Sequence, residues 1–244
     1  MKILVCISNV PDTTAKINFT PDNKEFVSAG VTFILNPYDE IALSRAVDLT
    51  AGGGSVTVLN VGDSTTEPTI RKALAIGATD AVRVNAVARD SHFVAVQIAE
   101  YVKQHPFDLI LCGRESADHN GSSVPAMVAE LLGIPCMLFA KSLAIDNGKA
   151  VIESEIEGGK QVLEAPLPIV AGASEGMAEW KIPNMRGIMS ARTKPLAVIE
   201  PVPVQEHVRH VRFDKPAPRS SVRMINADDA GSLFDILREE KKVI

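Results

Sequence analysis

The chain has 244 residues, of which 46% are hydrophobic and 23% charged, so it can bury one large core. Its net charge of -5 argues against general nucleic-acid binding, which needs a basic surface. No apolar run approaches the roughly 20 residues of a membrane helix. The first apolar run, residues 3–7, passes directly into Ser8 and Asn9, which is unlike a secretory signal. We therefore expect a cytoplasmic protein that does not insert into a membrane.

The cysteines and histidines indicate neither a metal site nor a catalytic group. Cys6, Cys112 and Cys136 are odd in number, widely spaced and set in apolar runs, which favours buried, reduced thiols over a disulfide framework or a zinc site. Among the histidines, only His119 lies in a candidate binding loop, and no carboxylate and nucleophile accompany it in the sequence. We expect no catalytic residue and no metal in this chain.

The first two-thirds of the chain alternate short apolar runs with amphipathic segments, the pattern of a parallel sheet covered by helices on both faces. Strands are predicted at residues 3–7, 56–61, 81–84, 109–112 and 137–140, and helices at 37–50, 65–76, 91–104 and after Gly121. Asn36 is predicted to cap the first helix, and Pro37 suits its first position. The sequence thus predicts a doubly wound, mostly parallel five-stranded α/β sheet with strand order 3-2-1-4-5.

The pattern changes after residue 150. Two runs at residues 151–156 and 160–163 surround Gly158-Gly159 and predict an added β-hairpin, and a further strand is expected at 168–173. The chain then becomes rich in proline, which disfavours long helices, before a final amphipathic helix at 228–241. We expect an α/β domain over residues 1–193, and an extended C-terminal arm ending in a helix over 194–244.

In a doubly wound sheet the ligand lies beyond the carboxyl ends of the strands, where the strand order reverses. For the expected order, this point brings the turn 8–12 beside the loop 113–125. Gly121, Ser122 and Ser123 in that loop would let backbone N–H groups approach a phosphate at the start of a helix. An ordinary Ser/Gly helix cap explains the same residues. Neither a G-x-G-x-x-G fingerprint nor a P-loop is present, so nucleotide binding without turnover is the better hypothesis.

Several segments together resemble the electron transfer flavoprotein beta subunit family over the length of the chain. They comprise residues 2–13, the Asn-Pro-aromatic helix start at 36–42, the helix 69–78, the hairpin with Glu155, Gly158 and Gly159 followed by Pro168, and residues 182–189, which are similar to the family's recognition loop.

The resemblance implies an electron carrier rather than an enzyme. It would be a heterodimer with an alpha subunit that supplies most of the FAD site, while this subunit holds AMP structurally. The residues that would surround AMP are Cys6, Asn36, Val61, Asp118, Asn120, Gly121, Ser122, Ser123 and Val124. Ile182, Pro183, Asn184 and Met185 would meet soluble flavin dehydrogenases such as acyl-CoA dehydrogenase, and an ETF-quinone oxidoreductase would accept the electrons. The final helix would clasp the alpha subunit.

Two alternatives remain open. Bifurcating members of the family bind a second FAD in the same pocket and usually carry Asp-Gly-Asp-Thr-Ala-Gln-Val-Gly, which this loop lacks, so AMP is preferred. Ser123-Val124-Pro125 stands where the family commonly has Gln-Thr-Gly or Gln-Val-Gly, and His119-Asn120 replaces an acidic or Gly-Asp pair. A stand-alone nucleotide-binding regulator of the universal-stress-protein kind would share the strand order and the loop, but it would need neither the hairpin nor the arm.

Overall fold

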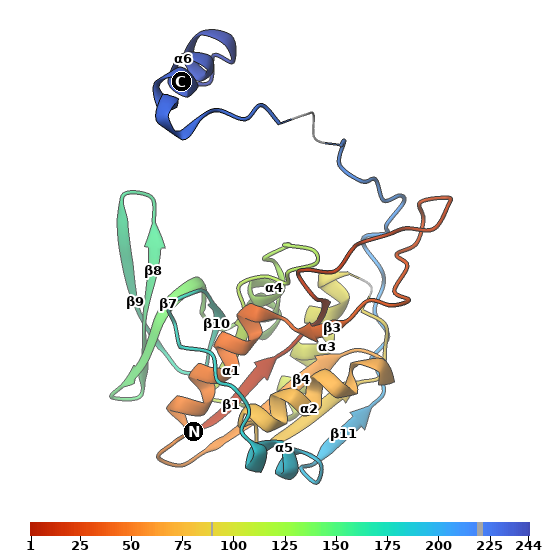
Figure 1. Ribbon diagram of the computed structural model, residues 1–244. Helices are drawn as coiled ribbons and strands as arrows, with labels where there is room; N and C mark the ends of the chain where they lie inside the picture. Colours follow the sequence, from red (N-terminus) through yellow and green to blue (C-terminus); the bar gives the residue numbers. More distant parts are fainter. Residues whose placement is uncertain (89, 219–221) are drawn as a thin grey trace.

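The computed structural model describes residues 1–88, 90–218 and 222–244, and its centre is a mostly parallel sheet with helices on both faces (Figure 1). Over these residues the sheet has nine strands in the order β11-β5-β4-β1-β6-β10-β7-β8-β9. Their bounds are β1 Lys2–Cys6, β4 Ser55–Val61, β5 Asp80–Val84, β6 Leu109–Gly113, β7 Cys136–Asp146, β8 Lys149–Ile156, β9 Gly159–Pro166, β10 Ile169–Ala173 and β11 Leu196–Ile199. The strands from β11 to β7 pair in parallel, and β8 and β9 are antiparallel.

The doubly wound α/β class is confirmed, but the five-strand order needs a correction. The predicted neighbours 3-2-1-4 are found as β5-β4-β1-β6, whereas the fifth predicted strand, β7, is separated from β6 by β10. All five residues of β10 are buried. A strand of small and apolar side chains, buried on both faces, belongs inside a parallel sheet rather than at its edge. The sequence order of the strands did not reveal this insertion.

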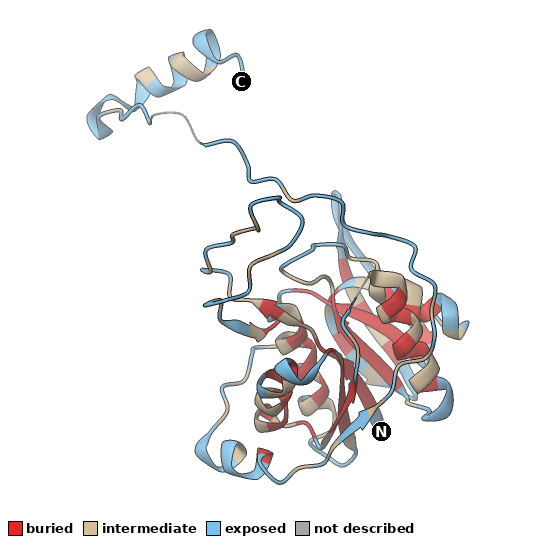
Figure 2. Ribbon diagram, turned by 90° about the vertical axis from the view of Figure 1, so that its right-hand side faces the viewer, coloured by how far each residue is buried: buried red, intermediate tan, exposed pale blue. Residues whose placement is uncertain are grey.

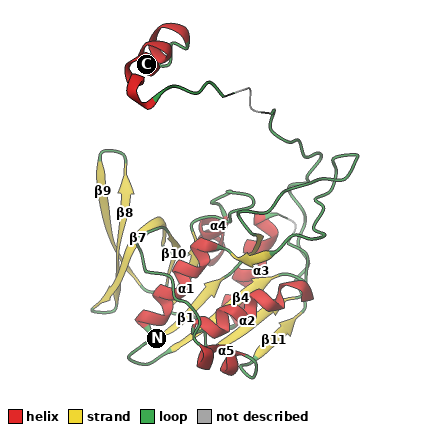
Figure 3. Cartoon of the chain, in the orientation of Figure 1, coloured by secondary structure: helices red, strands yellow, loops and turns green. Residues whose placement is uncertain are grey.

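Strand β7 is longer than expected and joins the parallel sheet to the hairpin. Its first residues pair with β10, and after a register shift between Ala140 and Ser142 the strand continues antiparallel to β8. The predicted hairpin is confirmed, since β8 and β9 pair from Lys149 with Pro166 to Ile156 with Gly159. The hairpin projects from the end of the sheet (Figure 3).

The helices bury two separate hydrophobic clusters, one on each face of the sheet. Helices α1, α2 and α5 contribute Leu43, Leu74 and Ala191 to one cluster, and α3 and α4 contribute Ile98 and Val128 to the other. The bounds are α1 Pro37–Leu49, α2 Glu67–Ile76 after the 3₁₀ turn η1 Ser64–Thr66, α3 Ser91–Gln104, α4 Val124–Leu132 and α5 Met185–Ala191. Buried residues concentrate on the sheet and on the inner sides of these helices (Figure 2).

The segment after β10 is more ordered than the sequence suggested. Residues expected to form a loop contain helix α5, and Arg71 ties this helix to α2 by donating to the carbonyls of Ala191 and Lys194, 2.8 Å each. Strand β11 then pairs with β5, so the sheet extends past the predicted boundary at residue 193. Its edge position suits a strand that follows Pro195, because proline cannot donate to a ladder.

The C-terminal arm runs from β11 to a helical segment that lies apart from the sheet (Figure 1). This segment comprises the 3₁₀ turn η2 Ala227–Asp229, helix α6 Ala230–Asp235 and the π-helical turn η3 Ile236–Glu240, close to the predicted helix. Of the described residues 222–244, none is buried.

Candidate functional site

The carboxyl ends of β1 and β6 meet where the strand order reverses, and a buried carboxylate joins them. Asp39 in α1 accepts hydrogen bonds from the backbone N–H of Ser8 at 2.7 Å and of Gly113 at 2.8 Å. A side chain at position 113 would collide with that carboxylate, so glycine is needed there. Burial raises the pKa of Asp39 to about 7, because loss of hydration outweighs the hydrogen bonds that favour the charged form. The predicted meeting of the turn 8–12 with the loop 113–125 is confirmed.

Asn36 occupies the N-cap position of α1, but the predicted side-chain cap is wrong. Its side chain makes no cap hydrogen bond. It donates instead to the carbonyl of Glu115 at 2.9 Å and accepts from the N–H of Ala117 at 3.1 Å. The side chain is fully buried, so both ends of the amide are used to hold the loop after β6 in place.

The loop before α4 presents a row of unpartnered backbone donors. Asn120 and Ser122 have left-handed φ angles of 49° and 48°, and Ser123 returns to a right-handed conformation. Among the described residues, nothing accepts a hydrogen bond from the N–H groups of Gly121, Ser122 or Ser123. Alternating left- and right-handed residues before a helix are the backbone arrangement typical of anion-binding concavities. The side chain of Ser123 makes no cap hydrogen bond, which argues against the simple cap interpretation.

The other residues expected around a nucleotide lie along the same edge of the sheet. Cys6 ends β1 and Val61 ends the neighbouring strand β4, while Asp118 and Asn120 are exposed in the loop. The thiol of Cys6 contacts Cys112 on β6, and this hydrogen bond together with burial raises the pKa of Cys112 well above its ordinary value. The three cysteines are free, as expected, but only Cys6 and Cys112 are buried, whereas Cys136 is partly exposed. Burial makes the thiols of the first two unreactive in character.

Two buried polar residues near this edge were not singled out from the sequence. Asn60 and Arg83 stand directly opposite each other on β4 and β5. Asn60 donates to the carbonyl of Ile7 at 2.9 Å, and Arg83 donates to the carbonyl of Gly62 at 3.0 Å. Each fixes the backbone just beyond a strand end. A side-chain amide inside the strand-like run 56–61, whose other members are Val, Leu and Thr, was the available signal for Asn60.

The start of the C-terminal arm crosses the α3 side of the loop. Gln97 in α3 both donates to and accepts from the backbone of Val202, at 2.9 and 2.8 Å. Asp90, the N-cap of α3, accepts from the N–H groups of His207 and Val208, both at 3.0 Å. Further along, the ring of His210 stacks on that of His119, with centroids 5.4 Å apart. The arm is therefore held beside the loop 113–125 over residues 202–210.

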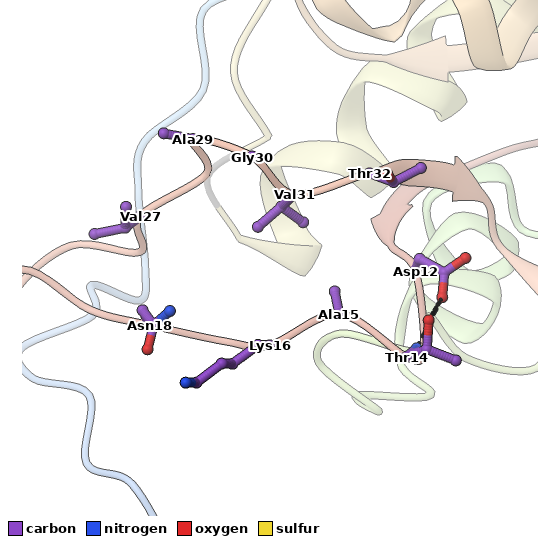
Figure 4. A pocket seen from close by; sticks show the side chains of 10 residues that line it. All are labelled: Asp12, Thr14, Ala15, Lys16, Asn18, Val27, Ala29, Gly30, Val31 and Thr32. Atoms are coloured by element: carbon purple, nitrogen blue, oxygen red, sulfur yellow. Dashed lines mark hydrogen bonds between the residues drawn. The ribbon is translucent and has the colours of Figure 1, made fainter.

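A polar cavity opens next to this region, in the excursion between the short strands β2 Asn9–Pro11 and β3 Phe33–Leu35. Its volume is about 380 Å³, and it lies between the two limbs of the loop 12–32 (Figure 4). Asp12 closes its inner end by accepting from the hydroxyl of Thr14 at 2.6 Å. Phe213 of the arm stacks on Phe19 of this loop at 4.9 Å, and Lys215 of the arm donates to Asn18, which lines the cavity, at 2.8 Å.

The residues expected to recognise protein partners form an exposed apolar patch. Ile182 is 80% exposed and Met185 73% exposed, and Asn184 caps α5 by accepting from the N–H of Gly187 at 2.8 Å. Pro183 lines a groove of about 520 Å³ between α2 and α5, together with Pro68, Arg71, Lys72, Ala75, Ile188, Ala191 and Arg192. The cap and the two bonds from Arg71 hold helix α5, which carries Met185 and directly follows the segment of Ile182 and Pro183.

Over the described residues, no group of three or more histidine, cysteine or acidic side chains is arranged to hold a metal ion. In the same part of the chain, no helix has the length and apolar character needed to cross a bilayer.

Comparison with known proteins matches residues 24–204 to the family model described as electron transfer flavoprotein domain. An electron transfer flavoprotein subunit beta from Syntrophomonas wolfei is 37% identical over 224 residues, covering 91% of this chain and 88% of the relative. The subunit beta of Bacillus subtilis is 30% identical over the whole of both chains, and that of Sus scrofa is 31% identical over 82% of this chain and 81% of its own. The chain belongs to the electron transfer flavoprotein beta subunit family.

Proposed function

We propose that this chain is the beta subunit of a cytoplasmic heterodimeric electron transfer flavoprotein and that it binds AMP structurally at the loop 118–124. The observation that carries the proposal is the row of three N–H groups at residues 121–123 that find no acceptor among the described residues, in a loop that follows β6 at the reversal of strand order in a chain of this family. Such donors satisfy a phosphate without any side-chain charge. Cys6, Asn36 and Val61 line or support the same edge.

An alpha subunit would hold most of the FAD, and the flavin supplies the redox chemistry. The proposed role of the residues of this chain is to bind and position the nucleotide. Asp39 and Asn36 keep the two loops at the carboxyl edge in a fixed geometry, and no proton or bond transfer is assigned to any side chain here.

The apolar patch around Ile182 supports transient docking of soluble flavin dehydrogenases such as acyl-CoA dehydrogenase. A small aliphatic anchor in an exposed segment gives a hot spot that forms and releases quickly. Pro183, Asn184 and Met185 present that anchor at the start of α5. A quinone oxidoreductase would take the electrons onward.

The arm over residues 194–244 is proposed to contact the alpha subunit. Leu233 and Phe234 of α6 are exposed although apolar, at 44% and 56%. A helix that buries none of its described residues within its own chain gains stability from a partner.

The complex co-expressed with its alpha subunit tests the proposal by extraction of its bound nucleotides. We expect one FAD and one AMP per heterodimer. Two flavins per heterodimer would favour the bifurcating alternative, and a colourless monomer that never pairs would favour the stand-alone regulator. Because β11 belongs to the sheet, a truncation that asks whether the arm is needed for pairing should begin after Val204 rather than at residue 195.

A further inference from the structure

A carboxylate stands beside the row of free N–H groups, where an anion site would not be expected to carry one. Glu115 accepts a hydrogen bond from the hydroxyl of Ser122 at 2.9 Å. Its side chain is only 13% exposed. Because the hydroxyl and amide nitrogen of one serine lie about 3 Å apart, the carboxylate lies within roughly 6 Å of the amide nitrogen of Ser122.

The charge of Glu115 is balanced by a guanidinium that cannot move freely to the loop. Arg114 pairs with Glu115 at 3.3 Å. Its guanidinium also lies over the rings of Tyr38 and Phe139, with centroid distances of 5.3 and 5.0 Å. Stacking between two rings fixes the orientation of an arginine. Arg114 pairs with the Oε1 oxygen of Glu115, whereas the hydroxyl of Ser122 donates to Oε2, so the pair presents its negative end to the loop.

We infer that Glu115 selects the charge of the nucleotide, so that this subunit accepts a nucleoside monophosphate and disfavours di- and triphosphates. This inference rests on the proposed nucleotide site. The backbone donors of residues 121–123 compensate one phosphate group. Each added phosphate brings a further negative charge close to the carboxylate, in a partly buried place where Coulomb repulsion is weakly screened. Arg114 meets the Glu115 oxygen that does not meet Ser122, and the rings of Tyr38 and Phe139 hold it there, so it attracts an added phosphate less than Glu115 repels it.

The test measures the affinities of AMP, ADP and ATP by calorimetry, using the purified complex of the full chain stripped of nucleotide. We expect the wild type to bind AMP most tightly. Glu115→Gln keeps an oxygen acceptor for Ser122 but removes the charge, so the ratio of ATP to AMP affinity should rise by about tenfold or more. Glu153→Gln is the matched control, because Glu153 pairs with Lys160 on the distant hairpin; this variant should leave the ratio unchanged.

A second variant keeps the test decisive if Glu115→Gln folds poorly. Arg114→Gln leaves the Glu115 charge uncompensated, so discrimination against ATP should become stronger. A wild type that binds ATP as tightly as AMP, or a Glu115→Gln complex with an unchanged ratio, would overturn the inference while leaving the nucleotide site intact. A complex that binds none of the three nucleotides would instead refute the proposed function.

Discussion

The carboxyl edge of the sheet buries polar side chains, whereas the segment from Trp180 to Met189 exposes apolar ones. At the carboxyl edge, the polar side chains of Asn36 and Asp39 are buried, and each holds two backbone groups. In the second region, Ile182 and Met185 are apolar and yet exposed. The nucleotide site proposed at the first region needs fixed donors, whereas the transient docking proposed at the second needs apolar surface that a partner covers only briefly. Mutations that disturb one region while sparing the other can test this contrast.

The largest expected effect comes from Asp39→Ala, which would leave the N–H groups of Ser8 and Gly113 buried without an acceptor. Each unsatisfied buried donor costs about 1–3 kcal/mol, so we expect a loss of about 3–5 kcal/mol in the free energy of unfolding. Urea denaturation measures this change. Asp48→Ala is the control, because Asp48 lies in the same helix and pairs at the surface with Lys181; its effect should be below about 1 kcal/mol. Equal losses for the two variants would contradict the bridging role.

The pH dependence of the free energy of unfolding gives a second test of the buried Asp39 carboxylate. The folded pKa of Asp39, about 7, exceeds its ordinary value of 3.8, so the folded state binds more protons than the unfolded state between these values. Its contribution to stability is therefore fully present below about pH 4 and is lost as the pH rises to 7, with a slope of at most about 1.4 kcal/mol per pH unit.

Asp39→Asn removes this slope because an amide does not titrate, and its single carbonyl also leaves one donor unpaired. Denaturation at a series of pH values distinguishes the wild type from the Asp39→Asn variant. The carboxyls whose pKa is lowered, such as Asp63 and Asp90, act in the opposite direction and only as the pH falls below their ordinary value. A wild-type curve that is flat between pH 4 and 7 would rule out the titration of Asp39.

In the proposed docking region, Ile182→Ala should raise the KM for a partner dehydrogenase by about tenfold, because a truncated hot-spot side chain costs at least about 1.4 kcal/mol. The nucleotide content and the free energy of unfolding should stay unchanged, since the side chain is 80% exposed. Val162→Ala on the hairpin, 57% exposed, serves as the matched control in steady-state kinetics. A similar KM for both variants would show that Ile182 does not contribute to docking.

The smallest expected effect concerns the arm. Gln97→Ala removes both hydrogen bonds to Val202, which are worth about 0.5–1.5 kcal/mol each. Hydrogen exchange should therefore become faster over residues 202–210, while exchange in β1 and β6 stays slow. Gln104→Ala, at the exposed end of the same helix, should change neither. Unaltered exchange in the arm of the Gln97 variant would show that Asp90 and His210 hold it without help.

Where a local pattern decides the structure, the sequence predicted it well. The predicted helix 91–104 coincides with α3, because Asp90 supplies a cap and apolar residues recur at helical spacing. The hairpin followed from two strand-like runs around Gly158 and Gly159. The position of β10 was not predictable, because which strands become neighbours is a tertiary property that no single run encodes. Helix α5 was missed since it has only seven residues and one buried side chain, which leaves little periodic signal.

The candidate site shows the same limit. The loop, its small residues and the turn 8–12 were predicted, since the switch-point rule depends only on strand order. The second role of Asp39 was not, because an acidic residue in a first helical turn is already explained by the helix dipole. Asn36 was misassigned for the same reason: its position suits a cap, and only the fold brings Glu115 and Ala117 within reach of its amide.

The insertion of β10 between β6 and β7 also sets an order for synthesis on the ribosome. Residues 1–113 contain four adjacent strands and can pair as soon as they emerge, but the far side of β6 stays open until Ile169–Ala173 has been translated. During that interval β7 has no parallel neighbour, and the edge of β6 exposes unpaired backbone groups. The nascent chain thus carries an unpaired strand edge for more than fifty residues of translation, and such an edge favours aggregation until β10 covers it.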